Sequence, residues 1–298
     1  MSEHTHSHSH SISSDLPLHR LIWAIAINVL LTVAQIIGGV LSGSLSLIAD
    51  ALHNLSDAIS LLIALIARKI SIKEYDDSMT FGYKRAETIA AFTNLITLVL
   101  VGFYLIYEAL WRLNEPQIIE GWMVVMVAGI ALVIDIATAL LTYSVSQNSM
   151  NIRVAFLHNV SDALASLAVM IAGSLIILYE WYWVDTLLTL LIATYVLYQA
   201  YVTLPEVINI LMQGTPKNIK TVDVLELIES IEGVESLHHL HLWQLDEHHN
   251  ALEAHVVLED IHSFEAIKKE IKLQLKEKFH ILHSSLEFEL TPCQEEHC

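Results

Sequence analysis

Six long apolar stretches dominate the first two thirds of the chain. Each is close to or above the roughly 20 residues that a helix needs to cross the hydrocarbon core of a bilayer. The stretches are Leu21–Val40, Leu45–Ala67, Ile89–Leu110, Trp122–Val145, Val154–Leu178 and Trp183–Leu204. We therefore predict a polytopic α-helical membrane protein with six transmembrane helices, the first two joined by a tight hairpin at 41–44.

Basic residues flank these stretches unequally. One set of connections holds only Arg112, and the other set holds Arg20, Arg68, Lys69, Lys73, Lys84, Arg85, Arg153, Lys217 and Lys220. Because basic flanks stay on the cytoplasmic side, we predict that both termini are cytoplasmic. The start of the chain has no basic region followed by a short apolar core, so we expect no cleaved signal peptide.

The pattern changes after Gly214-Thr215-Pro216 to that of a soluble domain. Apolar residues recur at helical spacing and then alternate as in strands. The predicted elements are a helix at 222–231, strands at 237–245 and 251–258, a helix at 264–275 and a strand at 286–290. The order αββαβ predicts a ferredoxin-like α+β domain with helices on one face of the sheet.

These patterns divide the chain into four parts. We expect a His-rich cytoplasmic tail at 1–18, a six-helix membrane domain at 19–212, a cytoplasmic domain at 213–292 and a Cys/His tail at 293–298. Composition agrees, since 54% of the 298 residues are hydrophobic and only 16% are charged, against about 25% charged in soluble proteins. The formal net charge of −18 excludes a nucleic-acid partner and suits a protein that handles cations.

One short motif occurs twice within the predicted spans. Leu52–Ala58 in the second span and Leu157–Ala163 in the fifth are identical at six of seven positions. Each copy holds a histidine and, four residues later, an aspartate. Ionisable groups inside a membrane are costly and indicate a functional site.

The spacing of the motif predicts a metal site. Residues four apart share one face of a helix, and the two spans run antiparallel, so His53, Asp57, His158 and Asp162 would meet around one point. Two nitrogens and two oxygens are suitable ligands for tetrahedral zinc. The alternative is that each His-Asp pair is a buried, hydrogen-bonded packing element.

Several motifs resemble the cation diffusion facilitator (CDF) family, along nearly the whole chain. Besides the two His-x-x-x-Asp motifs, they are Phe81–Glu87, Ile208–Pro216, His238–Trp243 and Leu252–Val256. The resemblance implies a zinc efflux transporter of the zinc-selective type, with histidine in the second-span motif. It also implies export from the cytosol by alternating access, in exchange for protons, as a homodimer.

A second metal site is expected on the open face of the cytoplasmic sheet. Alternation places His255 opposite the apolar Ala254, and it places His283 and Glu289 on the same side of the last strand. Strict alternation adds His239 and His241, whereas the family resemblance favours His238. A bulge would reconcile the two assignments. The alternative reading is that these are solvated surface histidines.

The tails and three membrane acids are weaker candidates. His4, His6, His8 and His10 would bind metal weakly or have no function, and Cys293 and Cys298, with His297, would hold zinc or be an idle tail. Asp50, one turn before His53, is either a hydrogen-bond partner behind the metal ligands or a vestibule residue. Asp135 is a pore or packing residue, and Asp185 is expected at the membrane interface beside Trp181 and Trp183.

Two competing classes are less favoured. A membrane zinc hydrolase needs an open coordination position, and the sequence has no His-Glu-x-x-His. A membrane-embedded metal sensor would bind zinc without moving it. We expect a transporter rather than an enzyme, in the cytoplasmic membrane of a bacterium.

Overall fold

The structure is a computed structural model that describes residues 18–73, 75–146 and 150–292. The His-rich tail up to residue 17 and the tail that contains Cys293 and Cys298 lie outside these residues. The described residues divide into two compact units: the first contains 18–62 and Asn94–Val202, and the second contains Ile63–Thr93 and 203–292, without the gaps just named.

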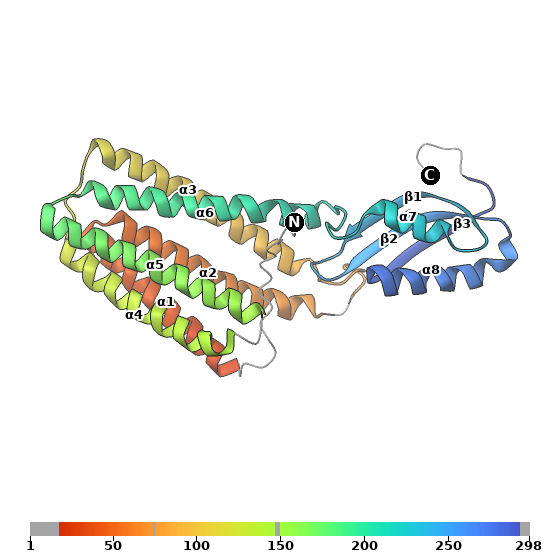
Figure 1. Cartoon of the computed structure of the whole chain (residues 1–298), viewed down its shortest axis with the longest axis horizontal. Coiled ribbons are helices and arrows are strands. Elements are labelled where there is room, and N and C mark those ends of the chain that lie inside the picture. Colours follow the sequence, from red (N-terminus) through yellow and green to blue (C-terminus); the bar gives the residue numbers. More distant parts are fainter. Residues whose placement is uncertain (1–17, 74, 147–149, 293–298) are drawn as a thin grey trace. The chain divides into compact units, whose positions relative to one another are not determined.

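Six long helices occur among the described residues, at the six predicted positions (Figure 1). They are α1 (Leu18–Ser42), α2 (Leu45–Ser71), α3 (Ala86–Asn114), α4 (Gly121–Ser146), α5 (Met150–Tyr179) and α6 (Trp183–Leu211). Within the described residues, α3, α6 and most of α4 and α5 are long and apolar enough to cross a membrane.

The hairpin between α1 and α2 is held by the start of α6. Asp185 is fully buried, and its carboxylate accepts hydrogen bonds from Ser44 Oγ at 2.5 Å, Ser46 Oγ at 2.6 Å and the Leu45 backbone N–H at 2.8 Å. A carboxylate at a helix N-terminus satisfies backbone N–H groups that have no partner within the helix. Asp185 thus lies in the first turn of α6, near Trp181 and Trp183 as expected, and its carboxylate is buried against the hairpin.

Two further contacts fix the same hairpin. Arg112 at the end of α3 donates from Nη1 to the Gly43 carbonyl at 2.6 Å, and the Glu120 N–H donates to the Ser42 carbonyl at 2.9 Å. Gly43 has a φ of +76°, which L side chains rarely adopt. This end of the bundle thus contains the ends of α1, α3 and α5 and the starts of α2, α4 and α6.

The C-terminal domain has the predicted αββαβ order. Its elements are α7 (Thr221–Glu229), β1 (Val234–Gln244), β2 (Asn250–Leu258), a 3-10 turn (Ile261–Ser263), α8 (Phe264–Phe279) and β3 (Ile281–Glu289). Strand β2 is central, antiparallel to β1 and parallel to β3, because the crossover through α8 returns the chain in the same direction. The predicted α+β fold is confirmed.

One face of this sheet is covered by both helices. Leu252, Ala254 and Val256 of β2 are fully buried and share an apolar core with Ile228 of α7 and Ile271 of α8. Since side chains alternate along a strand, the ring of His255 lies on the opposite face. The helices therefore determine which face of the sheet can carry a polar site.

A bulge in β1 decides the position of its histidines. His238 pairs with His255, but the next pair is His241 with Glu253, so β1 has one extra residue here. The extra residue lies beside His239, whose φ is +49°. A bulge shifts the alternation of side chains by one residue. Residues before and after the bulge therefore do not follow one alternating pattern, and counting residues does not give the relative faces of His238 and His241.

Candidate metal centres

Helices α2 and α5 bring the four motif residues together. His53 Nε2 lies 3.8 Å from Asp57 Oδ2 and 3.7 Å from Asp162 Oδ1. His158 Nε2 lies 3.3 Å from Asp57 Oδ2 and 3.5 Å from Asp162 Oδ2. Each imidazole thus faces one carboxylate on its own helix and one on the other helix.

Ligand atoms of His53, Asp57 and Asp162 all lie within 4.8 Å of one another, and His158 lies outside that group of three. Ligand atoms at zinc lie about 2.0–2.1 Å from the ion, which places neighbouring corners of a tetrahedron about 3.3–3.4 Å apart. The four nitrogen–oxygen distances, 3.3–3.8 Å, are at or slightly above that value. Oδ1 of Asp162 is buried and makes no hydrogen bond within the described part of the chain, as expected for an oxygen whose partner would be an ion.

The exposure of the four side chains differs between the two ends of the site. Asp57 and His158 are 30% and 38% exposed, whereas His53 and Asp162 are each 12% exposed. Asp57 and His158 are the pair farther from the α1–α2 hairpin, since α2 starts there and α5 ends there. The site is therefore more open on the side away from that hairpin.

A buried polar layer lies on the other side of the site, toward the hairpin. Asp50 accepts a hydrogen bond from Gln35 of α1 at 2.7 Å, and Ser166 of α5 donates to Asp135 of α4 at 2.8 Å. Asn54 donates to Gln35 at 3.1 Å. The side chains that contact the Asp50 carboxylate are Gln35 of α1 and, at 3.5 Å, Ser166 of α5.

Gln35 and Ser166 did not stand out in the sequence. Ser166 lies four residues after Asp162 and thus one turn along the same face of α5. The spacing alone could therefore have identified Ser166 as a neighbour of the site. Gln35 is a single amide in the otherwise apolar middle of α1, and polar residues in spans commonly bond across helices. Asp135, predicted as a pore or packing residue, contributes to this layer.

The cytoplasmic domain contains a second group of metal-binding side chains. His255 Nδ1 lies 2.7 Å from Glu289 Oε1, and His238 Nε2 lies 3.4 Å from Glu289 Oε2. One ligand atom from each of the three residues lies within 4.8 Å of the others. The bulge also brings the ring of His239 to 5.2 Å from both His238 and His255.

His283 does not join this group. It lies near the start of β3, six residues before Glu289, and a strand rises about 3.3 Å per residue. Its ring instead packs against Phe81 at 5.4 Å between centroids. The candidate ligands that come together on the open face are therefore His255, Glu289 and His238, the histidine that the family resemblance favoured, and placing His283 with them is a correction. Alternation alone cannot measure distance along a strand.

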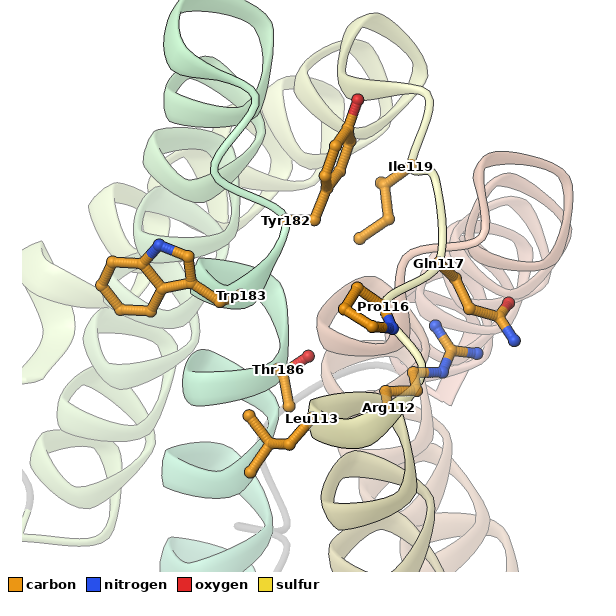
Figure 2. A pocket seen from close by; sticks show the side chains of 8 residues that line it. All are labelled: Arg112, Leu113, Pro116, Gln117, Ile119, Tyr182, Trp183 and Thr186. Atoms are coloured by element: carbon orange, nitrogen blue, oxygen red, sulfur yellow. The ribbon is translucent and has the colours of Figure 1, made fainter.

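A cavity at the hairpin end of the bundle offers no metal ligands. Its volume is about 50 Å³, enough for about one or two waters. Figure 2 shows its lining residues, which are Arg112, Leu113, Pro116, Gln117, Ile119, Tyr182, Trp183 and Thr186. This lining contains no histidine, carboxylate or thiol, so the cavity is not a metal centre.

The sequence profile of the cation efflux transmembrane domain matches residues 21–212, which include all four motif residues. The chain belongs to the cation efflux family. A second profile, the cytoplasmic domain of cation efflux proteins, matches residues 216–289. The α+β domain is thus the cytoplasmic domain of a cation efflux protein.

Several relatives in the family resemble the whole chain. Zinc transporter ZitB of Escherichia coli is 33% identical over 99% of this chain and 95% of its own. A cadmium, cobalt and zinc/H(+)-K(+) antiporter of Bacillus subtilis is 36% identical over 86% of this chain and 84% of its own. The metal cation efflux system protein CzcD of Cupriavidus metallidurans is 36% identical over 91% of this chain and 86% of its own.

Proposed function

We propose that this cation efflux protein exports zinc from the cytosol through a site formed by His53, Asp57, His158 and Asp162. The observation that carries the proposal is the set of four crossed imidazole–carboxylate distances of 3.3–3.8 Å. Two nitrogens and two oxygens in this arrangement suit zinc. Zinc is also named among the substrates of the ZitB and antiporter relatives.

The exposure of the site supports loading from the cytoplasm. The cytoplasmic domain follows α6, so the end of α6 faces the cytoplasm and the α1–α2 hairpin faces the exterior, with both termini inside. Asp57 and His158, the more exposed pair, then face the cytoplasm. The described conformation is the one that accepts an ion from inside, in a bacterial cytoplasmic membrane.

Exchange for protons has a simple chemical basis. Histidine and aspartate bind a metal only when they are deprotonated, so protons and zinc compete for the same atoms. A site that opens to a more acidic exterior releases zinc as protons bind, and it reloads when it opens to the cytosol. The Bacillus relative is named as a proton-coupled antiporter.

The cytoplasmic group is proposed as a regulatory zinc site in a homodimer. Glu289 accepts a hydrogen bond from His255 Nδ1 at 2.7 Å when that nitrogen is protonated, and Nε2, which lies 3.7 Å from Glu287 Oε2, is then the nitrogen that would bind a metal. A second zinc site in this domain would let the cytosolic zinc level act on the transporter. A sensor that binds zinc without moving it is the alternative function.

Zinc uptake into inside-out vesicles tests the transport site. His53→Ala and Asp162→Ala each remove one corner of the tetrahedron, and we expect uptake to fall at least about tenfold, as for loss of a metal ligand or its support. Ser161→Ala is the matched control, because its hydroxyl bonds to the Leu157 carbonyl of its own helix. If the unaltered protein bound zinc but did not carry it into the vesicles, the protein would be a sensor instead.

A further inference from the structure

The bundle closes in successive layers from the transport site toward the α1–α2 hairpin. Asp57 and His158 are 30% and 38% exposed, and His53 and Asp162 are 12% exposed. The next layer, which we call the polar layer, consists of Gln35, Asp50, Asp135 and Ser166, all at 8% exposure or less. Beyond it, an apolar layer of Leu47, Val124, Ala128 and Val169 is fully buried.

The polar layer joins two pairs of helices. Gln35 of α1 bonds to Asp50 and Asn54 of α2 at 2.7 and 3.1 Å, and Asp135 of α4 accepts from Ser166 of α5 at 2.8 Å. Across these pairs, Ser166 Oγ lies 3.5 Å from Asp50 Oδ2. A hydroxyl has one hydrogen to donate, and the shorter bond takes it to Asp135.

The contact between Ser166 and Asp50 is therefore a weak seam. Hydrogen bonds within each helix pair are short, whereas the contact across the pairs, 3.5 Å between Ser166 Oγ and Asp50 Oδ2, is at the upper limit of hydrogen-bond length and competes with Asp135 for one hydrogen. A protein–protein hydrogen bond that is exchanged for bonds to water costs little net free energy. Ser166 and Asp50 can therefore move apart and bond to water instead. When they come together again, each polar group still has a hydrogen-bond partner.

We propose that the polar layer is the outer gate of the transporter, and that it opens at the seam between Asp50 and Ser166 to release the ion to the exterior. The proposal rests on the orientation given under the proposed function. When the seam opens, Asp50 and Asp135 line the exit path, where two carboxylates attract a leaving cation. Leu47 on α2 and Val169 on α5 lie one turn farther out and separate with the gate.

The competing explanation is a packing network that stays closed throughout the cycle. The two explanations differ in what Ser166→Ala does. If the layer is a gate, loss of the Ser166 hydroxyl removes the remaining polar contact with Asp50 across the two pairs and favours the outward-open state. If it is only a packing network, the same change loosens the helices without opening a path to one side of the membrane.

Cysteine labelling distinguishes them. The sequence has only two cysteines, Cys293 and Cys298, so a Cys293→Ser/Cys298→Ser background is free of reactive thiols. Ala128→Cys is a small change at a fully buried position of the apolar layer, and Val169→Cys is a second reporter on α5. Intact cells and inside-out vesicles are treated with a membrane-impermeant maleimide to compare access from the two sides.

The matched control for Ser166→Ala is Ser174→Ala. Ser174 is two turns farther along α5, and its hydroxyl bonds to the Met170 carbonyl of the same helix at 2.8 Å. We expect Ser166→Ala to speed labelling of the reporter in intact cells at least about fivefold over Ser174→Ala, as a shift in population. Labelling in inside-out vesicles should not change.

Two outcomes would overturn the gate. Equal labelling rates for Ser166→Ala and Ser174→Ala with both reporters would show that the layer does not control access. Faster labelling from both sides would show a loosened bundle. Failure of the underlying orientation is distinguishable, because the reporters would then respond to Ser166→Ala in inside-out vesicles alone.

Discussion

His255 is the side chain on which the cytoplasmic group depends. Its ring contacts Glu289 through Nδ1 at 2.7 Å, and it is 5.2 Å from the rings of both His238 and His239. His283 has the same chemistry but packs against Phe81. The two histidines therefore form a matched pair, one within the group and one outside it.

We predict that His255→Ala removes zinc from the cytoplasmic site and that His283→Ala does not. The measurement is the number of zinc ions bound per full-length chain, by calorimetry, in a His53→Ala/Asp162→Ala background that lacks the transport ligands. Without His255, both the metal nitrogen and the partner of Glu289 are lost. Equal losses with His255→Ala and His283→Ala would contradict the assignment.

Single residues also show the limit of alternation as a guide. It identified the open face and His255 from sequence, because β2 alternates regularly between the covered and open faces. It could not choose between His238 and His239, because that choice depends on a backbone irregularity in β1. His239 has a φ of +49°. A glycine at this position would have indicated a positive φ, but the sequence has a histidine there, so the residue type did not point to the bulge.

At the scale of elements, the bulge in β1 is predicted to require a residue that tolerates positive φ. We expect His239→Gly to keep the stability of the protein, whereas His239→Val should lower it by about 1–3 kcal/mol, because a β-branched residue is strained there. Thermal unfolding of the full-length protein measures the stability of both variants. Zinc binding by the cytoplasmic site should survive His239→Gly and weaken with His239→Val as the register of His238 shifts.

If His239→Gly abolished zinc binding while leaving stability unchanged, His239 itself would be a required ligand. If His239→Val behaved like His239→Gly in both measurements, the bulge would not depend on this backbone conformation. Either result would revise the path of β1 described here.

The attachment of α6 to the start of α2 is a second element-scale feature. We predict that Asp185→Ala destabilises the bundle by about 2–4 kcal/mol, because it removes charge-assisted hydrogen bonds and leaves the Leu45 N–H without its acceptor. Asp185→Asn keeps one acceptor oxygen and should lie between Asp185→Ala and the unaltered protein. Thermal unfolding in detergent tests the order, and an unchanged midpoint for Asp185→Ala would contradict it.

At the scale of the whole molecule, transport should respond to the proton gradient in a definite direction. Protons compete with zinc for the four ligands, so an acidic exterior promotes release there. In inside-out vesicles the lumen corresponds to the exterior. We predict faster zinc uptake when the lumen is more acidic than the medium, and a slower rate when an ionophore dissipates the gradient.

The control for this prediction is the Ser161→Ala protein, which should respond to the gradient like the unaltered chain. Uptake that ignores the gradient would contradict proton exchange while leaving zinc transport itself intact. The Asp162→Ala protein should show little uptake with or without the gradient.

The sequence by itself determined the six long helices, the αββαβ domain and the repeated His-x-x-x-Asp motif. These depend on local periodicity and on the cost of ionisable groups in a membrane, and both can be read from neighbouring residues. Only the tertiary structure decided that Asp185 is buried, that Gln35 and Ser166 extend the polar layer and that His238 joins His255. Each of these depends on a partner distant in the chain, such as Ser44, 141 residues before Asp185, or on a bulge that shifts a strand by one residue.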